Sequence, residues 1–277
     1  MTNSSRAGAI EPLRVMNAIA NWRLLTHNFV VSSKPIAPPP SDATVVGAII
    51  FPGIDQADFT GPFEVLASMA RVSFHLLAKT ITPVRDARGL VLTPDTTFAQ
   101  TPPLDVLVIP GGGGVNALME DETVLAFVRE QVARAKLVLS VCTGALVLGA
   151  AGLLRGRRAT THWASHHLLA EFGAIPVNAR VVHDDKFVFG AGVTSGIDAA
   201  LRVVARLRGD AAAQAIQLLM EYAPEPPFAS GTPEAAPPEV VAAVRSSLQA
   251  TLAARAAIAA RVAAKLAAPD GGATRAP

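Results

Sequence analysis

Cysteine is almost missing from this chain. Cys142 is the only one among 277 residues, so no disulfide can form within one molecule and no cysteine-based metal site can be built. The six histidines show no H-E-x-x-H or comparable ligand spacing either. We therefore expect no metal ion and no other cofactor, and the chain suits a reducing compartment.

Basic clusters and long apolar runs are also missing. Arg155, Arg157 and Arg158 are the only basic residues that gather within residues 44–235, a stretch that carries slightly more acidic than basic side chains. A nucleic-acid partner is therefore not expected. The first residues lack the pattern of a signal peptide, and outside glycine- and alanine-rich elements no apolar run is long enough to span a membrane. These absences favour a cytoplasmic protein without a membrane partner.

The chain is nevertheless rich in apolar residues. Hydrophobic residues make up 51% of it and the mean hydropathy is +0.37, which is typical of a folded globular protein. Residues 1–43 are polar and end in a proline-rich stretch, which predicts a flexible N-terminal extension. Residues 44–235 form the expected main domain. Residues 236–277 are alanine-rich with apolar residues every four positions, which predicts one long amphipathic helix and a tail.

Short β-branched runs alternate with helical patterns along the expected main domain. This alternation predicts an α/β fold with a mainly parallel sheet and helices on both of its faces. The expected strands are TVVGAIIF, VSFHLLA, DVLVIP, AKLVLSV and KFVFGAG. The expected helices, with apolar spacing near 3.6 residues, are TGPFEVLASMA, EDETVLAFVREQVARA, GALVLGAAGLL, HWASHHLLAEF and GIDAALRVVARL.

Cys142 stands where a strand pattern stops and a small-residue helix pattern begins, in VLSVCTGALVLGAAGLL. A strand that enters a helix through a tight turn presents the turn side chain above the sheet, beside the helix N-terminal amides. Because these amides favour a thiolate, we expect a nucleophile that reacts near neutral pH. An inert core cysteine is the alternative, since free cysteine is among the most buried residue types.

Two other strand ends carry candidate site residues. Asp55 and Asp58 follow the first expected strand, and four glycines at 111–114 follow DVLVIP. Ligands bind beyond the C-terminal ends of parallel strands, so these loops and Cys142 can share one pocket. The glycine run has neither P-loop nor dinucleotide spacing, so a nucleotide site is not expected. Its backbone N–H groups can instead form half of an oxyanion hole, with the Thr143 amide as the other half.

Simpler roles stay open for several of these residues. Asp55 and Asp58 can act as helix caps or turn acids, and the glycine run can be a plain turn. His162 is a lone histidine before Trp163, and such a residue is more often a structural hydrogen-bonding group than a base. His162 and Thr194 are the candidates for pocket residues outside the three loops.

Five segments together resemble the ThiJ/PfpI superfamily: IIFPGIDQADFTGP, DVLVIPGGGGVNALM, LSVCTGALVLGAAGLLRGRRATTHWA, GAGVTSGIDAAL and EYAPEPPF. The resemblance covers residues 44–240. It implies a flavodoxin-like three-layer α/β sandwich, usually a homodimer, with a cysteine at a strained nucleophile elbow. Many members place a glutamate opposite the cysteine, and the peptidase-like members follow the cysteine with histidine. The corresponding positions are Asp58 and Thr143 here, which favours the branch of the superfamily that hydrates isonitriles.

In that branch the functional set is a cysteine, the following threonine and the aspartate of a D-x-T-G-P loop, matched here by Cys142, Thr143 and Asp58. The resemblance implies a carbon–nitrogen hydro-lyase in which Cys142 attacks an isonitrile while Asp58 donates a proton and later activates water. A thioimidate then opens to an N-substituted formamide. Thr143 is expected to hold the intermediate, with Gly111 and Gly112 as further backbone donors. An Asp58 that is protonated at neutral pH requires a pKa raised by burial near a thiolate.

Other functions stay open. Glyoxalase-, deglycase- and peptidase-like enzymes occur in the same superfamily and use the same cysteine. A redox-sensing thiol protein without turnover is the non-enzymatic alternative. Transcriptional regulators join such a domain to a helix-turn-helix domain, but after residue 235 only about one helix is expected, with no second basic helix to enter a DNA groove.

Overall fold

The computed structural model describes residues 42–268. Residues 1–41 of the expected N-terminal extension and residues 269–277 of the expected tail therefore lie outside the described part.

A seven-stranded sheet forms the centre of the molecule, in the order β10-β11-β7-β6-β1-β2-β5. Neighbouring strands are parallel except β10, which pairs antiparallel with β11 at one edge. All five predicted strands are confirmed, as β1, β2, β6, β7 and β11. The bounds are β1 (Thr44–Ile49), β2 (Val72–Ala78), β5 (Thr96–Thr97), β6 (Val106–Ile109), β7 (Leu137–Val141), β10 (Val181–Asp184) and β11 (Phe187–Gly190). Two small sheets pair β3 (Val84–Arg85) with β4 (Val91–Leu92) and β8 (Arg158–Ala159) with β9 (Ile175–Pro176).

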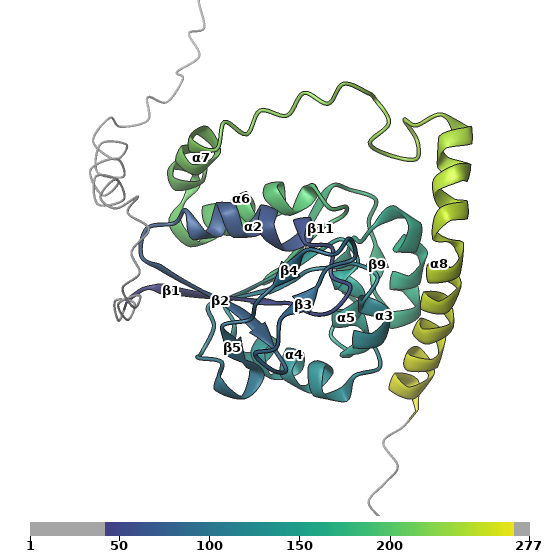
Figure 1. The fold of residues 1–277 in the computed structure, drawn as a ribbon, viewed down its shortest axis with the longest axis horizontal. Helices are drawn as coiled ribbons and strands as arrows, with labels where there is room; N and C mark the ends of the chain where they lie inside the picture. The colour runs from purple at the N-terminus through teal and green to yellow at the C-terminus, as the bar shows by residue number, and fades with distance from the viewer. Residues whose placement is uncertain (1–41, 269–277) are drawn as a thin grey trace, which may run out of the picture.

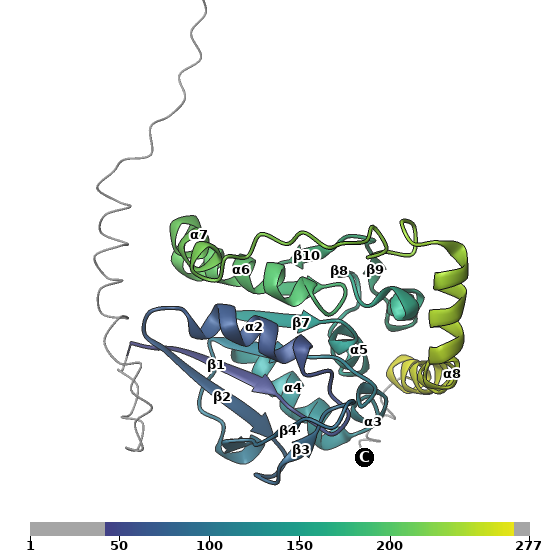
Figure 2. The same ribbon diagram turned by 45° about the horizontal axis from the view of Figure 1, so that its top comes forward.

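Helices cover both faces of this sheet. Figure 2 shows α2 and α6 on one face and α4 and α5 on the other, and α6 contacts β7 and β11 while α5 contacts β6 and β7. The predicted flavodoxin-like three-layer sandwich is confirmed. The helices of the sandwich are α2 (Ala57–Ala67), α3 (Val115–Leu118), α4 (Glu122–Arg134), α5 (Gly144–Ala150), α6 (Ser195–Arg208) and α7 (Asp210–Leu219), with a short 3-10 helix η2 (Phe98–Gln100).

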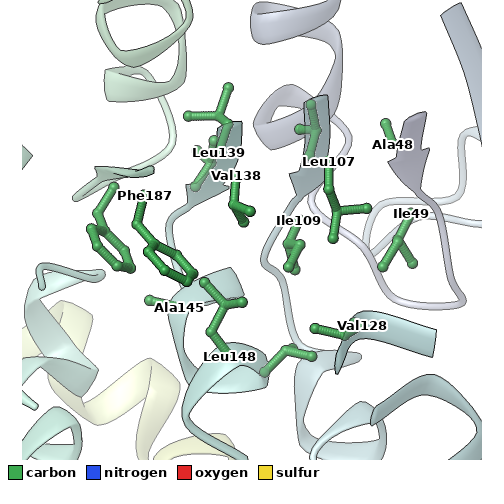
Figure 3. Packing of buried hydrophobic residues seen from close by; sticks show 14 of the residues in the cluster. Ala48, Ile49, Leu107, Ile109, Val128, Val138, Leu139, Ala145, Leu148 and Phe187 are labelled. Atoms are coloured by element: carbon green, nitrogen blue, oxygen red, sulfur yellow. The ribbon is translucent and has the colours of Figure 1, made fainter. Parts of the chain in front are cut away.

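The hydrophobic core fills the space between the sheet and its helices. Every residue of β6 and β7 is buried, as expected for central parallel strands covered on both faces. Figure 3 shows Ile109 of β6 and Phe187 of β11 on the side of the sheet where Ala145 and Leu148 of α5 and Val128 of α4 lie. This packing fixes the C-terminal ends of β6 and β7, which carry the glycine loop and Cys142.

Two predicted helices differ from their expected form. Helix α2 begins at Ala57, so Asp58 lies in its first turn and not in the loop before it. The early start is possible because Asp55 Oδ1 accepts the Ala57 N–H at 3.2 Å. HWASHHLLAEF forms a 3-10 helix, η3 (Trp163–Phe172), and not an α-helix. It packs against α5, α8 and β9.

The expected C-terminal helix is present as α8 (Pro238–Ala267), but Val240 and Val244 of its expected apolar face are exposed, and its buried residues are Arg255, Ala259 and Val262. It contacts η3, α5 and α3 and lies along one side of the molecule (Figure 1). Residues 220–237 form the long, largely exposed connection from α7 to α8 (Figure 1). None of the helices within residues 42–268 combines the length and the apolar character that crossing a membrane requires.

Candidate active site

Cys142 forms the turn between β7 and α5. Its φ is +55°, in the left-handed region that residues with a side chain rarely adopt. Two hydrogen bonds hold this turn: the Cys142 amide donates to the Gly190 carbonyl at 3.0 Å, and the Cys142 carbonyl accepts the Thr161 hydroxyl at 2.6 Å. Such a conformation costs about 1–3 kcal/mol and persists only where its surroundings enforce it. The expected strained elbow is therefore present.

Asp58 is fully buried in the first turn of α2, opposite Cys142. Its Oδ2 accepts the Gly111 N–H at 2.9 Å, whereas Oδ1 has no hydrogen-bond partner among the described residues. Burial and then the charge of Asp55 raise the pKa of Asp58 to about 7, against the opposing effect of the Gly111 amide and the Cys142 thiol. This is the direction expected from the sequence, and a pKa near 7 makes both protonation states of the carboxyl accessible at neutral pH.

The Cys142 side chain is only 6% exposed. Burial, followed by the negative charge of Asp58, raises the pKa of the Cys142 thiol well above its usual range, although the Thr143 amide acts in the opposite direction. These two effects oppose the expected thiolate, and a Cys142 that reacts near neutral pH stays a prediction. Helix amides favour the thiolate, but desolvation and a facing carboxyl outweigh them.

Gly111 and Gly112 bring the acid and the threonine to the elbow. A Cβ atom on Gly111 would lie 2.5 Å from the Thr143 nitrogen and 2.8 Å from Asp58 Oδ2, so only glycine fits there. The Gly112 N–H donates to Thr143 Oγ1 at 3.0 Å, and the Thr143 hydroxyl is 3.3 Å from the Gly112 carbonyl. The Gly111 and Gly112 amides thus have protein partners here. Their expected role as donors to a reacting atom stays a prediction.

Asp55 lies at the edge of this arrangement. Besides accepting the Ala57 N–H before α2, its carboxylate pairs with Arg88 at 3.2 Å, and its amide donates to the Gly111 carbonyl at 2.9 Å. The same charge contributes to the raised pKa of Asp58. The simple capping role considered from sequence is therefore accompanied by an electrostatic one.

The two candidate pocket residues occupy different surroundings. His162 is half-buried, and its Nδ1 accepts the Ala164 N–H at 3.4 Å at the start of η3. Burial, and then the charge of Arg255, lowers the pKa of His162, which favours a neutral ring. Thr194 is exposed and its hydroxyl lies 3.4 Å from the Arg180 guanidinium. Contact of either residue with a ligand stays a prediction.

The structure adds two residues that sequence reasoning missed. Thr161 holds the Cys142 carbonyl, and Arg255 of α8 reaches the Gly112 carbonyl at 3.2 Å. Thr161 belongs to the quoted ATTHW segment, which marked its neighbourhood but not its role. Arg255 is one of several basic residues in an alanine-rich helix, and no local pattern distinguishes it. Within residues 42–268 no three His, Cys, Asp or Glu side chains gather in a way that could hold a metal ion.

Comparison with known proteins agrees with this geometry. The model of the DJ-1/PfpI family matches residues 45–206. An isonitrile hydratase from Pseudomonas putida is 54% identical over 203 residues, covering 73% of this chain and 89% of that protein. A crystal structure of a ThiJ/PfpI family protein from Pseudomonas syringae matches with a TM-score of 0.77 and 38% identity, covering 85% of this chain and 99% of that one. A glutathione-independent glyoxalase from Caenorhabditis elegans is 29% identical over 129 residues, covering 46% of this chain and 69% of that protein.

The family match runs from β1 into α6 and so includes Asp58, the glycine loop and the Cys142 elbow. It also confirms the resemblance inferred from the sequence motifs. By its matched domain, its fold and its strained elbow, this chain belongs to the DJ-1/PfpI family.

Proposed function

We propose that this protein is an isonitrile hydratase, a carbon–nitrogen hydro-lyase that converts R–N≡C and water to R–NH–CHO. One observation carries the proposal: Cys142 and Asp58 form a buried pair in which the thiol lies within reach of the carboxyl and Asp58 Oδ1 has no other hydrogen-bond partner among residues 42–268. A buried carboxyl oxygen without a partner is costly and calls for a functional explanation. The 54% identity to the Pseudomonas putida enzyme supports the same activity.

The first step needs a proton and a nucleophile at one carbon, and this pair can supply both. Asp58 takes the thiol proton of Cys142 and delivers it to the terminal carbon of the isonitrile, while Sγ bonds to that carbon. One bond of the N≡C group is used, and the product is the thioimidate R–N=CH–S–Cys142. Atoms and charge balance without an oxidant or reductant.

The second step returns the enzyme to its starting state. Asp58 accepts a proton from water as the hydroxyl adds to the thioimidate carbon, and this proton reaches the nitrogen. The new hydroxyl proton then passes to sulfur as the C–S bond breaks and the carbonyl forms. A carboxyl with a pKa of about 7 suits both directions of transfer near neutral pH.

Thr143 and the glycine loop would hold the reacting atoms. The Thr143 amide already favours negative charge on Cys142, and we assign it the same task for the intermediate. Its hydroxyl is fixed by the Gly112 backbone, so its position is set before substrate binds. The Gly111 N–H donates to Asp58 and the Gly112 N–H donates to Thr143 in this structure. Donation to the intermediate would require these N–H groups to share or break those hydrogen bonds.

We also propose a cytoplasmic homodimer that acts on a small molecule without nucleic acid. Apolar surface that a second subunit can cover is present: Leu218 and Leu219 of α7 are 81% and 58% exposed, and Val240 and Val244 of α8 are 43% and 40% exposed. Sedimentation velocity over a range of concentrations measures the assembly. A monomer at all micromolar concentrations would contradict the dimer.

The activity is tested with cyclohexyl isocyanide. Wild type, Cys142→Ala and Asp58→Asn are incubated with it, and N-cyclohexylformamide is followed by chromatography. We expect formamide from wild type and none above background from either variant. Full activity of Asp58→Asn would contradict the acid–base role. If wild type makes no formamide, the same samples are assayed with methylglyoxal and for oxidation of Cys142, because glyoxalase activity and redox sensing are the competing functions.

A further inference from the structure

One charged side chain of the C-terminal helix lies inside the molecule. Arg255 of α8 is 5% exposed, and no carboxylate of residues 42–268 pairs with it. Removing a cation from water without a counter-ion is costly. The mechanism described so far does not use this residue, so its burial needs another explanation.

The Arg255 guanidinium joins three segments around the elbow. Nη2 donates to the Gly112 carbonyl at 3.2 Å, Nη1 to Ser165 Oγ of η3 at 2.9 Å, and Nε to Asn116 Oδ1 of α3 at 2.8 Å. The Gly112 carbonyl is the group that also faces the Thr143 hydroxyl. Arg255 therefore fixes the Gly112 backbone, and this backbone in turn positions Thr143 next to Cys142.

The charges around Cys142 give the guanidinium a second effect. Asp58 from α2 and Asp55 from the loop before it both disfavour negative charge on the sulfur. His162 of η3 has a lowered pKa and is no source of positive charge. The Gly112 carbonyl that accepts from Arg255 also faces the Thr143 hydroxyl, which places the guanidinium beside the elbow. Consistent with this position, burial lowers the pKa of Arg255 and a negative charge on Cys142 raises it.

We propose that Arg255 is a positioning residue of the active site, which fixes the Gly112–Thr143 pair and supplies positive charge that stabilises Cys142 as a thiolate. The proposal rests on the proposed function only in taking Cys142 as the reacting group. It makes α8, which lies outside the segment matched by the family model, a part of the site.

The test measures thiolate formation directly. Cys142 is the only cysteine, so its alkylation by iodoacetamide can be followed by mass spectrometry of the intact chain from pH 6 to 10. In Arg255→Gln we expect alkylation at pH 8 to slow about tenfold and the pH profile to move upward by about one unit. Arg255→Lys keeps the charge and should recover most of the rate. Arg261→Gln is the matched control, because Arg261 lies on the same helix but pairs with Glu120 at the surface.

Thermal unfolding of each variant separates positioning from stability. If Arg255→Gln unfolds earlier but its folded form keeps the wild-type alkylation profile, the role is structural and the proposal is overturned. If Arg255→Gln does not fold, Asn116→Ala removes one contact of the guanidinium and should shift the profile in the same direction by less, and no shift would overturn the proposal. No isonitrile is present in this assay, so its outcome is independent of whether the protein proves to be a hydratase.

Discussion

Gly111 is the residue at which the site has least free space. A methyl group there would meet the Thr143 nitrogen at 2.5 Å and Asp58 Oδ2 at 2.8 Å. We expect Gly111→Ala to move the acid away from Cys142 and to lower kcat/KM for an isonitrile by about 100-fold, since small misplacements at a reacting centre have effects of this size. Steady-state formamide production measures the change.

Gly113 provides the matched control for that substitution. It belongs to the same glycine run, but a Cβ atom there would have nothing within 4 Å. Gly113→Ala should keep activity within about twofold of wild type, because no contact is created. Equal activity of the two alanine variants would show that the Gly111 amide does not position Asp58.

The raised pKa of Asp58 also predicts how stability depends on pH. The folded value is about 7 and the ordinary value is about 4, so between these pH values the native state binds more protons than the unfolded state. The contribution of Asp58 to the free energy of unfolding is therefore largest below about pH 4, and it falls as the pH rises toward 7. The loss is at most on the order of 4 kcal/mol.

Asp58→Asn removes this group, so its unfolding free energy should fall less than that of wild type from pH 5 to pH 8. Urea unfolding at pH 5, 6.5 and 8 tests this, and parallel pH dependence of the two proteins would contradict it.

At this scale the sequence predicts which residues meet and the direction in which the pKa of Asp58 is shifted, but not the protonation of Cys142. Asp58 follows β1 and Cys142 follows β7, and the glycine loop after the intervening β6 contacts both Asp58 and Thr143, so the topology brings these residues together. The pKa of Cys142 depends on burial and on the carboxyl opposite it, neither of which is encoded in the strand-to-helix turn. The burial of Arg255 is not predictable from the sequence, because a buried and an exposed arginine can stand in the same local sequence pattern.

At the scale of elements, predictability follows how local the signal is. The five predicted strands β1, β2, β6, β7 and β11 are short runs rich in apolar and β-branched residues, although Ser73 and His75 interrupt the run of β2. The two-residue strands have no period to detect. Helix η3 winds as a 3-10 helix, and its packing against α5 is visible at Gly149, whose added Cβ would lie 2.4 Å from a Phe172 ring carbon. An apolar period near 3.6 residues indicates a helix with one buried face, but it does not distinguish a 3-10 helix from an α-helix.

Helix α8 offers a comparison of two valines within one element. Val262 is 5% exposed and lies in the face that packs on the domain, whereas Val240 is 43% exposed near the start of the helix. We expect Val262→Ala to lower the unfolding free energy by about 1–3 kcal/mol, through lost burial and a cavity. Val240→Ala should change it by less than about 0.5 kcal/mol, because alanine also has high helix propensity. Urea denaturation measures the unfolding free energy of both variants. An effect of Val262→Ala as small as that expected for Val240→Ala would indicate that the buried face of α8 adds no stability.

At the scale of the whole molecule, α8 joins the parts of the chain that form the site. It is separated from α7 by residues 220–237, which are largely exposed, yet it returns to contact α3, α5 and η3 (Figure 1). The entropic cost of closing a loop grows only slowly with its length, so a connection of this length destabilises the packed helix little more than a shorter one would. Because Arg255 and Val262 lie buried in this contact, we expect the helix and the sandwich to unfold together.

Trp163 can report on this coupling. It is in η3, and the Arg245 guanidinium of α8 lies 4.9 Å from the centre of its ring. In a Trp22→Phe background, where Trp163 is the remaining tryptophan, its fluorescence and the far-UV circular dichroism should give the same urea midpoint, as in a two-state transition. Arg255→Gln should lower both midpoints by the same amount.

A change in fluorescence at clearly lower urea than the loss of helix would mean that α8 leaves the domain first. Cys142 would then lose the guanidinium while the sheet that carries it is still folded, and alkylation of Cys142 in that range of urea would show the consequence.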